Sequence, residues 1–382
     1  MSKQRQSDNL RTNTTCSVKT TCPYCGVGCG VDAKIKNGKI IAVSGDTKHP
    51  ANQGKLCVKG SALHETMGEH NRLLHPSING EQVDWPTAIT ITADKLNAIR
   101  RKHGPNAIAF YLSGQLLTED YYVANKLAKG FIGTANVDTN SRLCMSSAVA
   151  GYKRAFGSDA VPCNYQDIDL CDLLIITGSN AAWTHPVLYQ RMAAAKLNNP
   201  NMKIVVIDPR RTATCDLADL HLPVAPGSDA YIFNGLLNYL ANTDGLNKTY
   251  ISDHTEGFEQ ALKQTDNDTI DNVAQKTGLS AADLKQFYQW YKNTEKTITF
   301  YSMGVNQSST GTDKCNAIIN CHLATGSIGK AGAGPFSITG QPNAMGGREV
   351  GGLANMLAAH MDYSPAHIKT VGDFWQAENM AQ

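Results

Sequence analysis

Short apolar segments alternate with longer segments of helical periodicity over most of the chain after residue 86. The apolar segments have the composition of buried strands and occupy residues 107–112, 173–178, 203–208 and 297–304. Apolar residues recur with the period of an amphipathic helix at residues 86–103, 118–131, 145–157, 184–197 and 230–242. This alternation predicts an α/β fold, in which crossover helices connect the strands of parallel sheets.

The segments outside this alternation differ in character. Residues 31–45 read as two strands on either side of Asn37-Gly38, a pair that favours the type I′ turn of a hairpin. Residues 1–15 are polar and are expected to be disordered, and residues 245–295 read as a polar, mostly helical insertion. We therefore expect three parts, namely a tail at 1–15, a small domain at 16–75 and an α/β region at 76–382.

The bulk composition is that of an ordinary globular protein. Of the 382 residues, 42% are hydrophobic and 18% are charged, which suits roughly two or three domains. The net charge of +2 gives no field that would favour nucleic acid or a membrane surface as a partner. No apolar run approaches the roughly 18 residues of a spanning helix, and residues 1–21 contain neither an apolar signal segment nor a twin-arginine pair. The expected location is the cytoplasm.

Four of the eleven cysteines have a spacing that suits a metal site. Cys22, Cys25 and Cys29 lie in one short, glycine-containing loop, and Cys57 follows alone further along the chain. Three thiolates in one loop and a distant fourth can hold the corners of a 4Fe-4S cluster. Zinc usually takes its ligands in two pairs and fits less well, and free thiols are the third interpretation. Lys59 is either a surface charge or a link from the cluster to a second redox group.

A cluster motif followed by an α/β region resembles the molybdopterin oxidoreductases that carry a bis-(molybdopterin guanine dinucleotide) cofactor. The resemblance covers nearly all of residues 16–382 and rests on several separate motifs in the same order. It implies that Lys59 lies between the cluster and a pterin, and that Cys144, within TNSRLCMSSAV, is the thiolate ligand of molybdenum. Taken alone, Cys144 reads as a buried cysteine just before a helix. The family fold has a C-terminal part that this sequence lacks, so the chain alone is expected to bind the cofactor weakly or not at all.

Polar and glycine residues follow the predicted strands, where open parallel sheets bind nucleotides. Backbone N–H groups and arginines can bind phosphate oxygens there, and aspartates can accept from ribose hydroxyls or guanine nitrogens. Taken one at a time, such residues usually form turns. The resemblance implies that the cofactor is bound by Lys59, Gln115, Asn140, Gly178, Ser179, Asn180, Trp183, Asp208, Arg210, Arg211, Asp229, Met303 and Gln307.

Two later segments, GQPN at 340–343 and GREV at 347–350, resemble the active-site region of bacterial assimilatory nitrate reductases. The resemblance implies that Arg348 faces the substrate, because a planar guanidinium can hold a planar oxyanion by two hydrogen bonds. A surface ion pair between Arg348 and Glu349 is the alternative. Met145 follows the expected metal ligand, at a position where formate dehydrogenases of this family usually have a proton-accepting histidine. Met145 and Arg348 therefore favour nitrate over formate.

The implied function is the two-electron reduction of nitrate to nitrite, by oxygen-atom transfer at a molybdenum centre that receives electrons from the 4Fe-4S cluster. The expected catalytic residues are Cys144, Met145, Arg348 and Lys59. The electron donor is expected to be ferredoxin, flavodoxin or a flavin-containing NADH reductase subunit. Two alternatives stay open, namely a formate dehydrogenase of the same family and a non-catalytic, cluster-binding electron-transfer fragment.

Overall fold

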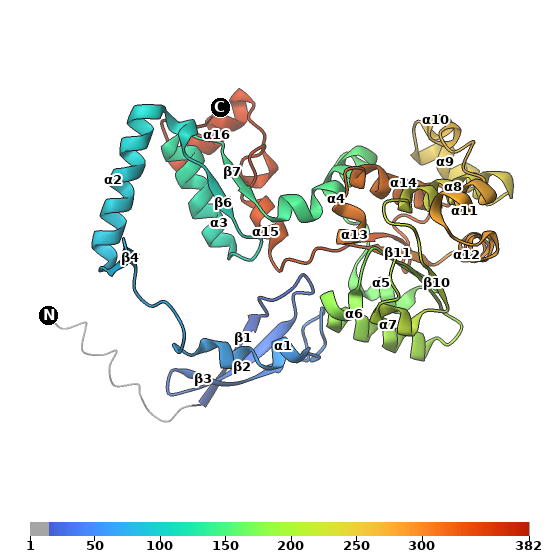
Figure 1. The fold of residues 1–382 in the computed structure, drawn as a ribbon, viewed down its shortest axis with the longest axis horizontal. Coiled ribbons are helices and arrows are strands. Elements are labelled where there is room, and N and C mark those ends of the chain that lie inside the picture. The colour runs from blue at the N-terminus through green and yellow to red at the C-terminus, as the bar shows by residue number, and fades with distance from the viewer. Residues whose placement is uncertain (1–14, 382) are drawn as a thin grey trace.

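The computed structural model describes residues 15–381 (Figure 1). The predicted disordered tail lies outside the described residues except for Thr15, which begins the first strand. Figure 1 shows three parts: a small antiparallel sheet, a unit near the C-terminus built around two short strands, and a larger α/β part. None of the helices in residues 15–381 combines the length and the apolar character that crossing a membrane requires.

The N-terminal sheet contains three antiparallel strands in the order β1 (Thr15–Thr21), β2 (Gly30–Lys36) and β3 (Lys39–Gly45). The predicted hairpin is confirmed, and Asn37 and Gly38 both have positive φ, as a type I′ turn requires. The sequence did not predict β1, because its residues are largely polar and none of them is buried. Its stability comes from backbone pairing with β2 along its whole length.

The segment after this sheet contains short elements and one long helix. The short elements are α1 (Val58–Ser61), η1 (Leu63–Met67), β4 (Ser77–Ile78) and β5 (Glu81–Gln82). The predicted helix is confirmed as α2 (Trp85–His103), which starts after Asp84 because that carboxylate accepts from the backbone N–H of Thr87. No residue of α2 is buried in the described chain, and the helix stands apart in Figure 1.

Five parallel strands form the larger sheet. Their order is β10 (Leu220–Leu222), β9 (Lys203–Ile207), β8 (Leu173–Thr177), β11 (Thr297–Tyr301) and β12 (Gly334–Ser337). Successive residues of β8 and β9 point into different cores, as the strand period of two requires. Ile175 packs with α8 (Asp229–Asn242) and α14 (Gly311–Ala324), and Ile176 packs with α7 (Pro186–Asn198). The predicted parallel α/β architecture is therefore confirmed.

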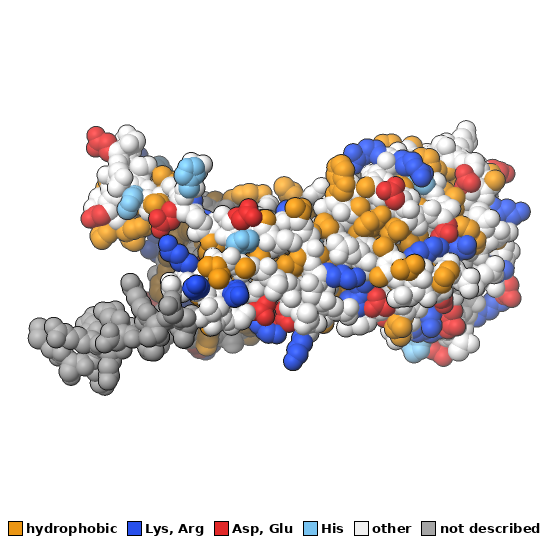
Figure 2. Space-filling view, turned by 90° about the horizontal axis from the view of Figure 1, so that it is seen from below, with side chains coloured by type: hydrophobic (Ala, Val, Ile, Leu, Met, Phe, Trp, Pro, Cys, Tyr) orange, Lys and Arg blue, Asp and Glu red, His pale blue; other side chains and the backbone are white. Residues whose placement is uncertain are grey.

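The remaining elements of this part complete its two faces. They are α5 (Tyr165–Leu170), α6 (Ala181–Thr184), η4 (Ala213–Leu217), α9 (Lys248–His254), α10 (Phe258–Lys263), α11 (Ile270–Thr277), α12 (Ala281–Asn293) and α13 (Met303–Asn306). Helices α9 to α12 confirm the helical interpretation of residues 245–295. Seen from below, the surface carries acidic and basic side chains interspersed, in keeping with the small net charge (Figure 2).

A second, smaller unit surrounds two parallel strands, β6 (Phe110–Leu112) and β7 (Val137–Thr139). We call it the β6–β7 unit. Its helices are η2 (Pro105–Ala107), α3 (Thr118–Asn125), the π-helix η3 (Lys126–Ile132), α15 (Ala344–Glu349), η5 (Ala358–His360) and α16 (Pro365–Trp375). Helix α4 (Ser141–Phe156) follows β7 and runs toward the larger sheet (Figure 1). The chain returns to the β6–β7 unit after β12.

Several predicted boundaries are wrong. The strand predicted at 107–112 begins at Phe110, because η2 occupies the preceding residues, and the strand predicted at 297–304 ends at Tyr301, where α13 follows. The helix predicted at 118–131 changes to a π-helix at Lys126. The helix predicted at 145–157 begins at Ser141, so Cys144 lies inside the first turn rather than before the helix.

Candidate active site

The four cysteines of the motif come together at one end of the N-terminal sheet. Cys22 follows β1 and Cys29 precedes β2, and the loop between them is closed by the Cys22 N–H donating to the Cys29 carbonyl at 2.9 Å. Cys57 caps α1. Burial, together with the charges of Cys25, Cys22 and Cys57, raises the pKa of the Cys29 thiol to about 12. All four thiols are therefore close enough to affect one another.

These thiols fit an iron–sulfur cluster better than a single ion. No three His, Cys, Asp or Glu side chains among residues 15–381 converge on one point as the ligands of one ion would. The ligands of a four-iron cluster bind four different irons, so their sulfurs do not need to converge in that way. None of the four cysteines forms a disulfide. Burial raises the pKa of Cys22 and Cys29 and so favours their protonated forms. Metal binding would displace these thiol protons.

Lys59 lies beside this loop. Its ammonium group is 5.8 Å from the centre of the Tyr24 ring. Burial raises the pKa of both Cys22 and Cys25, and the charge of Lys59 offsets part of that rise. The same charge contributes to the lowered pKa of His185, for which burial is the larger cause. Lys59 is therefore near both the cysteine loop and the segment that follows β8.

The cysteine loop is also bonded to the segment after β12. The Gly26 N–H donates to the Gly340 carbonyl at 3.1 Å. A Cβ atom on Gly26 would overlap the Thr339 carbonyl, so only glycine fits there. The buried His185 ring bonds to the same Thr339 carbonyl through Nε2 at 2.7 Å. Three separate segments thus meet at Thr339–Gly340.

The loops after β8 and β11 touch through their backbones at the carboxyl edge of the sheet. The Gly304 N–H donates to the Gly178 carbonyl at 2.9 Å, and a Cβ on Gly178 would lie 2.6 Å from the backbone nitrogen of Val305. Beside this contact the Ser179 hydroxyl is buried and has no hydrogen-bond partner in the described chain. A glycine contact and an unpaired hydroxyl are features of a backbone that binds a ligand closely.

Most of the other expected cofactor residues lie on the same edge. Asn180 accepts from the Thr214 hydroxyl at 2.9 Å, and Trp183 is exposed. Asp208 follows β9 and accepts from the Arg210 backbone N–H at 2.9 Å, while the Arg210 and Arg211 side chains are exposed. Backbone and side-chain donors from three neighbouring strands therefore gather where parallel sheets bind nucleotides.

Asp229, Met303 and Gln307 differ in their surroundings. Asp229 forms a buried ion pair with Lys314 at 2.7 Å, so one of its carboxylate oxygens is already engaged. The Met303 sulfur accepts from the Ser302 hydroxyl at 2.8 Å, and its methyl group faces Gly340. Gln307 is exposed.

Gln115 and Asn140 lie in the β6–β7 unit. The Asn140 side chain accepts from the Gly114 N–H at 2.6 Å, and the Gly114 carbonyl accepts from the Asn343 N–H at 3.2 Å. The loops after β6 and β7 are thus bonded to each other and to the 340–343 segment. The exposed Gln115 follows directly in the same loop.

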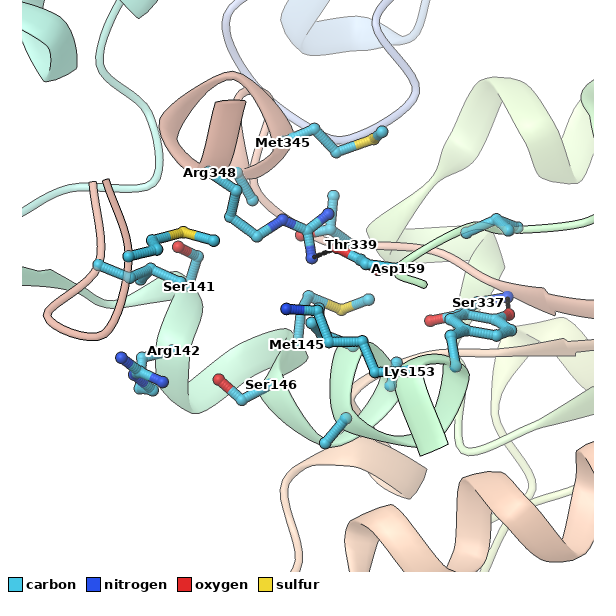
Figure 3. A pocket seen from close by; sticks show the side chains of 18 of the residues that line it. Ser141, Arg142, Met145, Ser146, Lys153, Asp159, Ser337, Thr339, Met345 and Arg348 are labelled. Carbon is cyan, nitrogen blue, oxygen red and sulfur yellow. Dashed lines mark hydrogen bonds and ion pairs between the residues drawn. The ribbon is translucent and has the colours of Figure 1, made fainter. Parts of the chain in front are cut away.

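A cavity of about 230 Å³ lies between α4 and α15 (Figure 3). Met145 and Lys153 reach it from α4, Arg348 reaches it from α15, and Thr339 lines it from the segment after β12. The structure therefore brings Met145 and Arg348 to one cavity. Cys144 does not line this cavity. It is 3% exposed and packs in the core between α4 and the sheet.

Arg348 is held by a residue that the sequence did not indicate. Its guanidinium bonds to Asp159 at 2.9 Å, with both side chains largely buried, and Figure 3 shows it reaching toward that carboxylate. Glu349 pairs instead with His360, so the alternative of an Arg348–Glu349 surface pair is wrong. The Nε atom of Arg348 is buried and has no partner in the described chain. Arg142 and Lys153 also line the cavity. Arg142 pairs with Asp138 at 3.0 Å, whereas Lys153 has no ion pair among the described residues and gives the cavity an excess of positive charge.

Comparison with known proteins identifies the family. The molybdopterin oxidoreductase Fe4S4 domain matches residues 15–69, and the molybdopterin oxidoreductase family matches residues 72–379. The chain belongs to the molybdopterin oxidoreductase family. A cluster-binding domain and a molybdopterin-binding region are therefore both present.

Individual relatives agree with this assignment. The chain is 57% identical to a nitrate reductase of Klebsiella oxytoca over 95% of its own length and 42% of that protein. It is 51% identical to a nitrate reductase of Shewanella frigidimarina over 95% of its own length and 40% of that protein. The chain thus spans about two fifths of these curated relatives. Acetylene hydratase from Pelobacter acetylenicus has the same fold, with a TM-score of 0.73 at 22% identity over 82% of this chain and 44% of that one.

The family assignment applies to the cysteine loop, the carboxyl edge of the larger sheet and the segment at Thr339–Gly340, which are bonded to one another. The matched Fe4S4 domain contains the cysteine loop, and the matched molybdopterin oxidoreductase region contains the carboxyl edge of the larger sheet. Sequence reasoning found residues of both but missed Asp159 and Thr339, which line the cavity. An aspartate in a glycine- and serine-containing loop gives no pattern that would separate Asp159 from an ordinary turn residue.

Proposed function

We propose that this chain is part of an assimilatory, cytoplasmic nitrate reductase, which reduces nitrate to nitrite and water with two electrons and two protons. The observation that carries the proposal is the convergence of Met145 and the partly unpaired guanidinium of Arg348 on one positively lined cavity. The similarity to two nitrate reductases over nearly the whole chain supports the choice of substrate.

The cofactors are assigned to residues as follows. Cys22, Cys25, Cys29 and Cys57 would hold the 4Fe-4S cluster within a domain at 16–75, and the thiolate of Cys144 would hold molybdenum within the region at 76–382. Cys144 directly precedes Met145 on α4 and is buried, so metal binding would require its thiol to turn toward the cavity. The bis-(molybdopterin guanine dinucleotide) is bound by Lys59, Gln115, Asn140, Gly178, Ser179, Asn180, Trp183, Asp208, Arg210, Arg211, Asp229, Met303 and Gln307. When bound, the metal centre supplies two-electron chemistry coupled to removal of an oxygen atom from nitrate.

Arg348 binds and orients the substrate. Asp159 engages Nη1 of the guanidinium, and the remaining donors of this group that line the cavity would bind a nitrate oxygen. Lys153 lines the same cavity without an ion pair among the described residues, so its charge raises the local concentration of anions.

Met145 makes the site unsuited to proton abstraction. Its sulfur accepts from the Asn306 side chain at 3.3 Å and has no acidic proton to exchange. Removal of an oxygen atom from nitrate needs no base at this position, whereas removal of hydrogen from formate does. This difference favours nitrate reductase over formate dehydrogenase.

When bound, the cluster would accept electrons from ferredoxin, flavodoxin or a flavin-containing NADH reductase subunit, and Lys59 would lie between the cluster and the pterin. The charge of Lys59 acts on both the cysteine loop and His185, which supports a position between the two sites. A non-catalytic electron-transfer role is the weaker candidate, because such a protein has no use for a cysteine in the position of Cys144.

The test uses the full-length natural protein, purified without oxygen. Cys144→Ala should lower viologen-driven nitrite production by more than about 100-fold, the upper range for losing even an indirect partner of a metal. Cys16→Ala removes an exposed thiol and should leave the rate unchanged. Iron and molybdenum are expected in a ratio of about four to one. A protein that contains iron but no molybdenum and produces no nitrite would contradict the proposal. Oxidation of formate would instead support the alternative function, formate dehydrogenase.

A further inference from the structure

Lys129 is a fully buried charge in the β6–β7 unit, and the proposed reaction makes no use of it. Its ammonium nitrogen donates to three backbone carbonyls, those of Gly351 at 2.6 Å, Leu353 at 2.7 Å and Met356 at 2.6 Å. An ammonium group has three N–H donors and no acceptor, so every donor is used. The contacts join parts of the chain more than two hundred residues apart.

The π-helix directs this side chain inward. Helix α3 continues directly into the π-helix Lys126–Ile132, whose wider turn buries Ala128, Lys129 and Gly130 together. A Cβ at Gly130 would lie 3.1 Å from the Trp375 ring, so a larger residue there would require the ring to shift. Single π-helical turns occur frequently at functional sites.

The three carbonyls belong to a segment that lines the candidate substrate cavity. We call residues 350–357 the wall loop. Leu353, Asn355 and Met356 of this loop line the cavity that contains Arg348. The wall loop directly follows α15, and the Gly351 N–H donates to the Arg348 carbonyl at 3.0 Å. Any shift of the wall loop therefore moves the end of the helix that carries Arg348.

The arrangement requires the charged form of Lys129. Burial lowers the pKa of its ammonium to about 7, while Asp138 on β7 acts in the opposite direction. Three carbonyl dipoles directed at the nitrogen also favour the charged form. A neutral amine has only two N–H donors, so one carbonyl would lose its partner. Three carbonyl oxygens directed at one point would also repel one another without a cation between them.

We propose that Lys129 is a positioning residue, which fixes the wall loop through its three carbonyl bonds and thereby holds Arg348 in place for substrate binding. The effect on substrate rests on the proposed function. The clamp on the wall loop does not, because it follows from the contacts alone.

The test compares two substitutions on the same π-helix in the full-length holoenzyme. Lys129→Met keeps the length of the side chain and removes all three donors. Lys126→Met is the matched control, because Lys126 is partly exposed and its ammonium, 6.0 Å from the centre of the Phe131 ring, has no hydrogen bond or ion pair among residues 15–381. Hydrogen exchange of residues 350–361 should accelerate about tenfold in Lys129→Met and stay near the wild-type rate in Lys126→Met, with β8 and β9 unchanged in both. The KM for nitrate should rise about tenfold with little change in kcat.

The two readouts separate failure of the clamp from failure of the proposed function. Wild-type exchange in Lys129→Met would overturn the clamp, whatever the activity. Faster exchange with an unchanged KM would overturn the positioning of Arg348. A wild-type protein that does not reduce nitrate would overturn the proposed function, and the exchange experiment would still decide the clamp. If Lys129→Met does not fold, Lys129→Gln keeps two donors, and a partial acceleration of the same residues is expected.

Discussion

Every residue of β8 and β11 is buried in the larger sheet, whereas β6 and β7 each contain residues that are only partly buried or exposed. Apolar layers cover both faces of the larger sheet. The β6–β7 unit has only a small apolar cluster around Trp375, and its loops are joined by single polar side chains such as Lys129, Asn125 and Asn140. In the larger sheet, stability comes from the burial of many apolar residues. In the β6–β7 unit, it depends on hydrogen bonds from a few polar side chains.

This difference assigns distinct roles to the two regions. The larger sheet provides a stable edge at which the loops after β8 and β11 meet. The β6–β7 unit provides the cavity wall and Arg348, whose position depends on bonds between distant segments. Regions of low local stability are the ones that open first, so we expect the β6–β7 unit to open before the sheet.

The largest effect is expected where the backbones of the larger sheet touch. Gly178→Ala forces a Cβ to within 2.6 Å of the Val305 nitrogen at a φ of +57°, and should lower the free energy of unfolding by at least about 3 kcal/mol. Gly157→Ala is the control, because Gly157 has a φ of +77° but no atom near its Cβ, and should cost only about 1 kcal/mol. If chemical denaturation gave the same loss of unfolding free energy for both variants, the positive φ, and not the close approach to Val305, would be the cause of the loss.

A smaller and local effect is expected at a polar joint of the β6–β7 unit. Asn125 donates from its buried side-chain amide to the Val350 carbonyl. Asn125→Ala leaves that carbonyl without its partner and should lower the free energy of local opening of residues 350–361 by about 1–2 kcal/mol. Native-state hydrogen exchange measures this directly, and β8 and β9 should keep their protection. Asn242→Ala, on the exposed end of α8, should change neither region. A loss spread equally over both regions would contradict the comparison.

The smallest effect concerns pH and the core of the larger part. His322 is fully buried against Thr299, and burial lowers its pKa from 6.5 to about 3. Between these values the unfolded chain binds a proton that the folded chain does not, so stability falls as the pH falls below 6.5. Proton binding to this histidine in the unfolded chain should lower the free energy of unfolding by about 1 kcal/mol between pH 7 and pH 5.5. His322→Gln should flatten the profile measured by denaturant titration, and His103→Gln, at the exposed end of α2, should not. An unchanged slope in His322→Gln would assign the acid sensitivity to other groups.

The sequence predicted the parts of the fold that depend on local patterns. Strands β8 and β9 are largely continuous apolar runs, β11 consists of β-branched and aromatic residues, and the Asn37-Gly38 turn has a characteristic composition. The exposed strand β1 was missed, because its pairing with β2 and not its own composition makes it a strand. The π-helix was missed for a similar reason, since its winding follows from tertiary contacts with Trp375 and the wall loop.

The candidate site was predictable where residues have a characteristic spacing or match a family motif. The cysteine loop and the segments of Cys144 and Arg348 are of this kind. The bonds from Asp159 to Arg348 and from Lys129 to the wall loop join residues that are far apart in the sequence and chemically ordinary in their own segments. Only the folded chain brings them together.

The contact at Gly26 limits how this protein can be recombined with its relatives. The cysteine loop has no space for a side chain at Gly26 because the Thr339 carbonyl lies against it, and the next carbonyl accepts its N–H. A chimera that exchanges only residues 15–69 for those of another family member would bring together two contact surfaces that come from different proteins. We expect such exchanges to succeed when residues 339 and 340 are exchanged together with the cluster domain. The cluster domain and residues 339–340 would then have to be exchanged as one unit, although they are distant in the sequence.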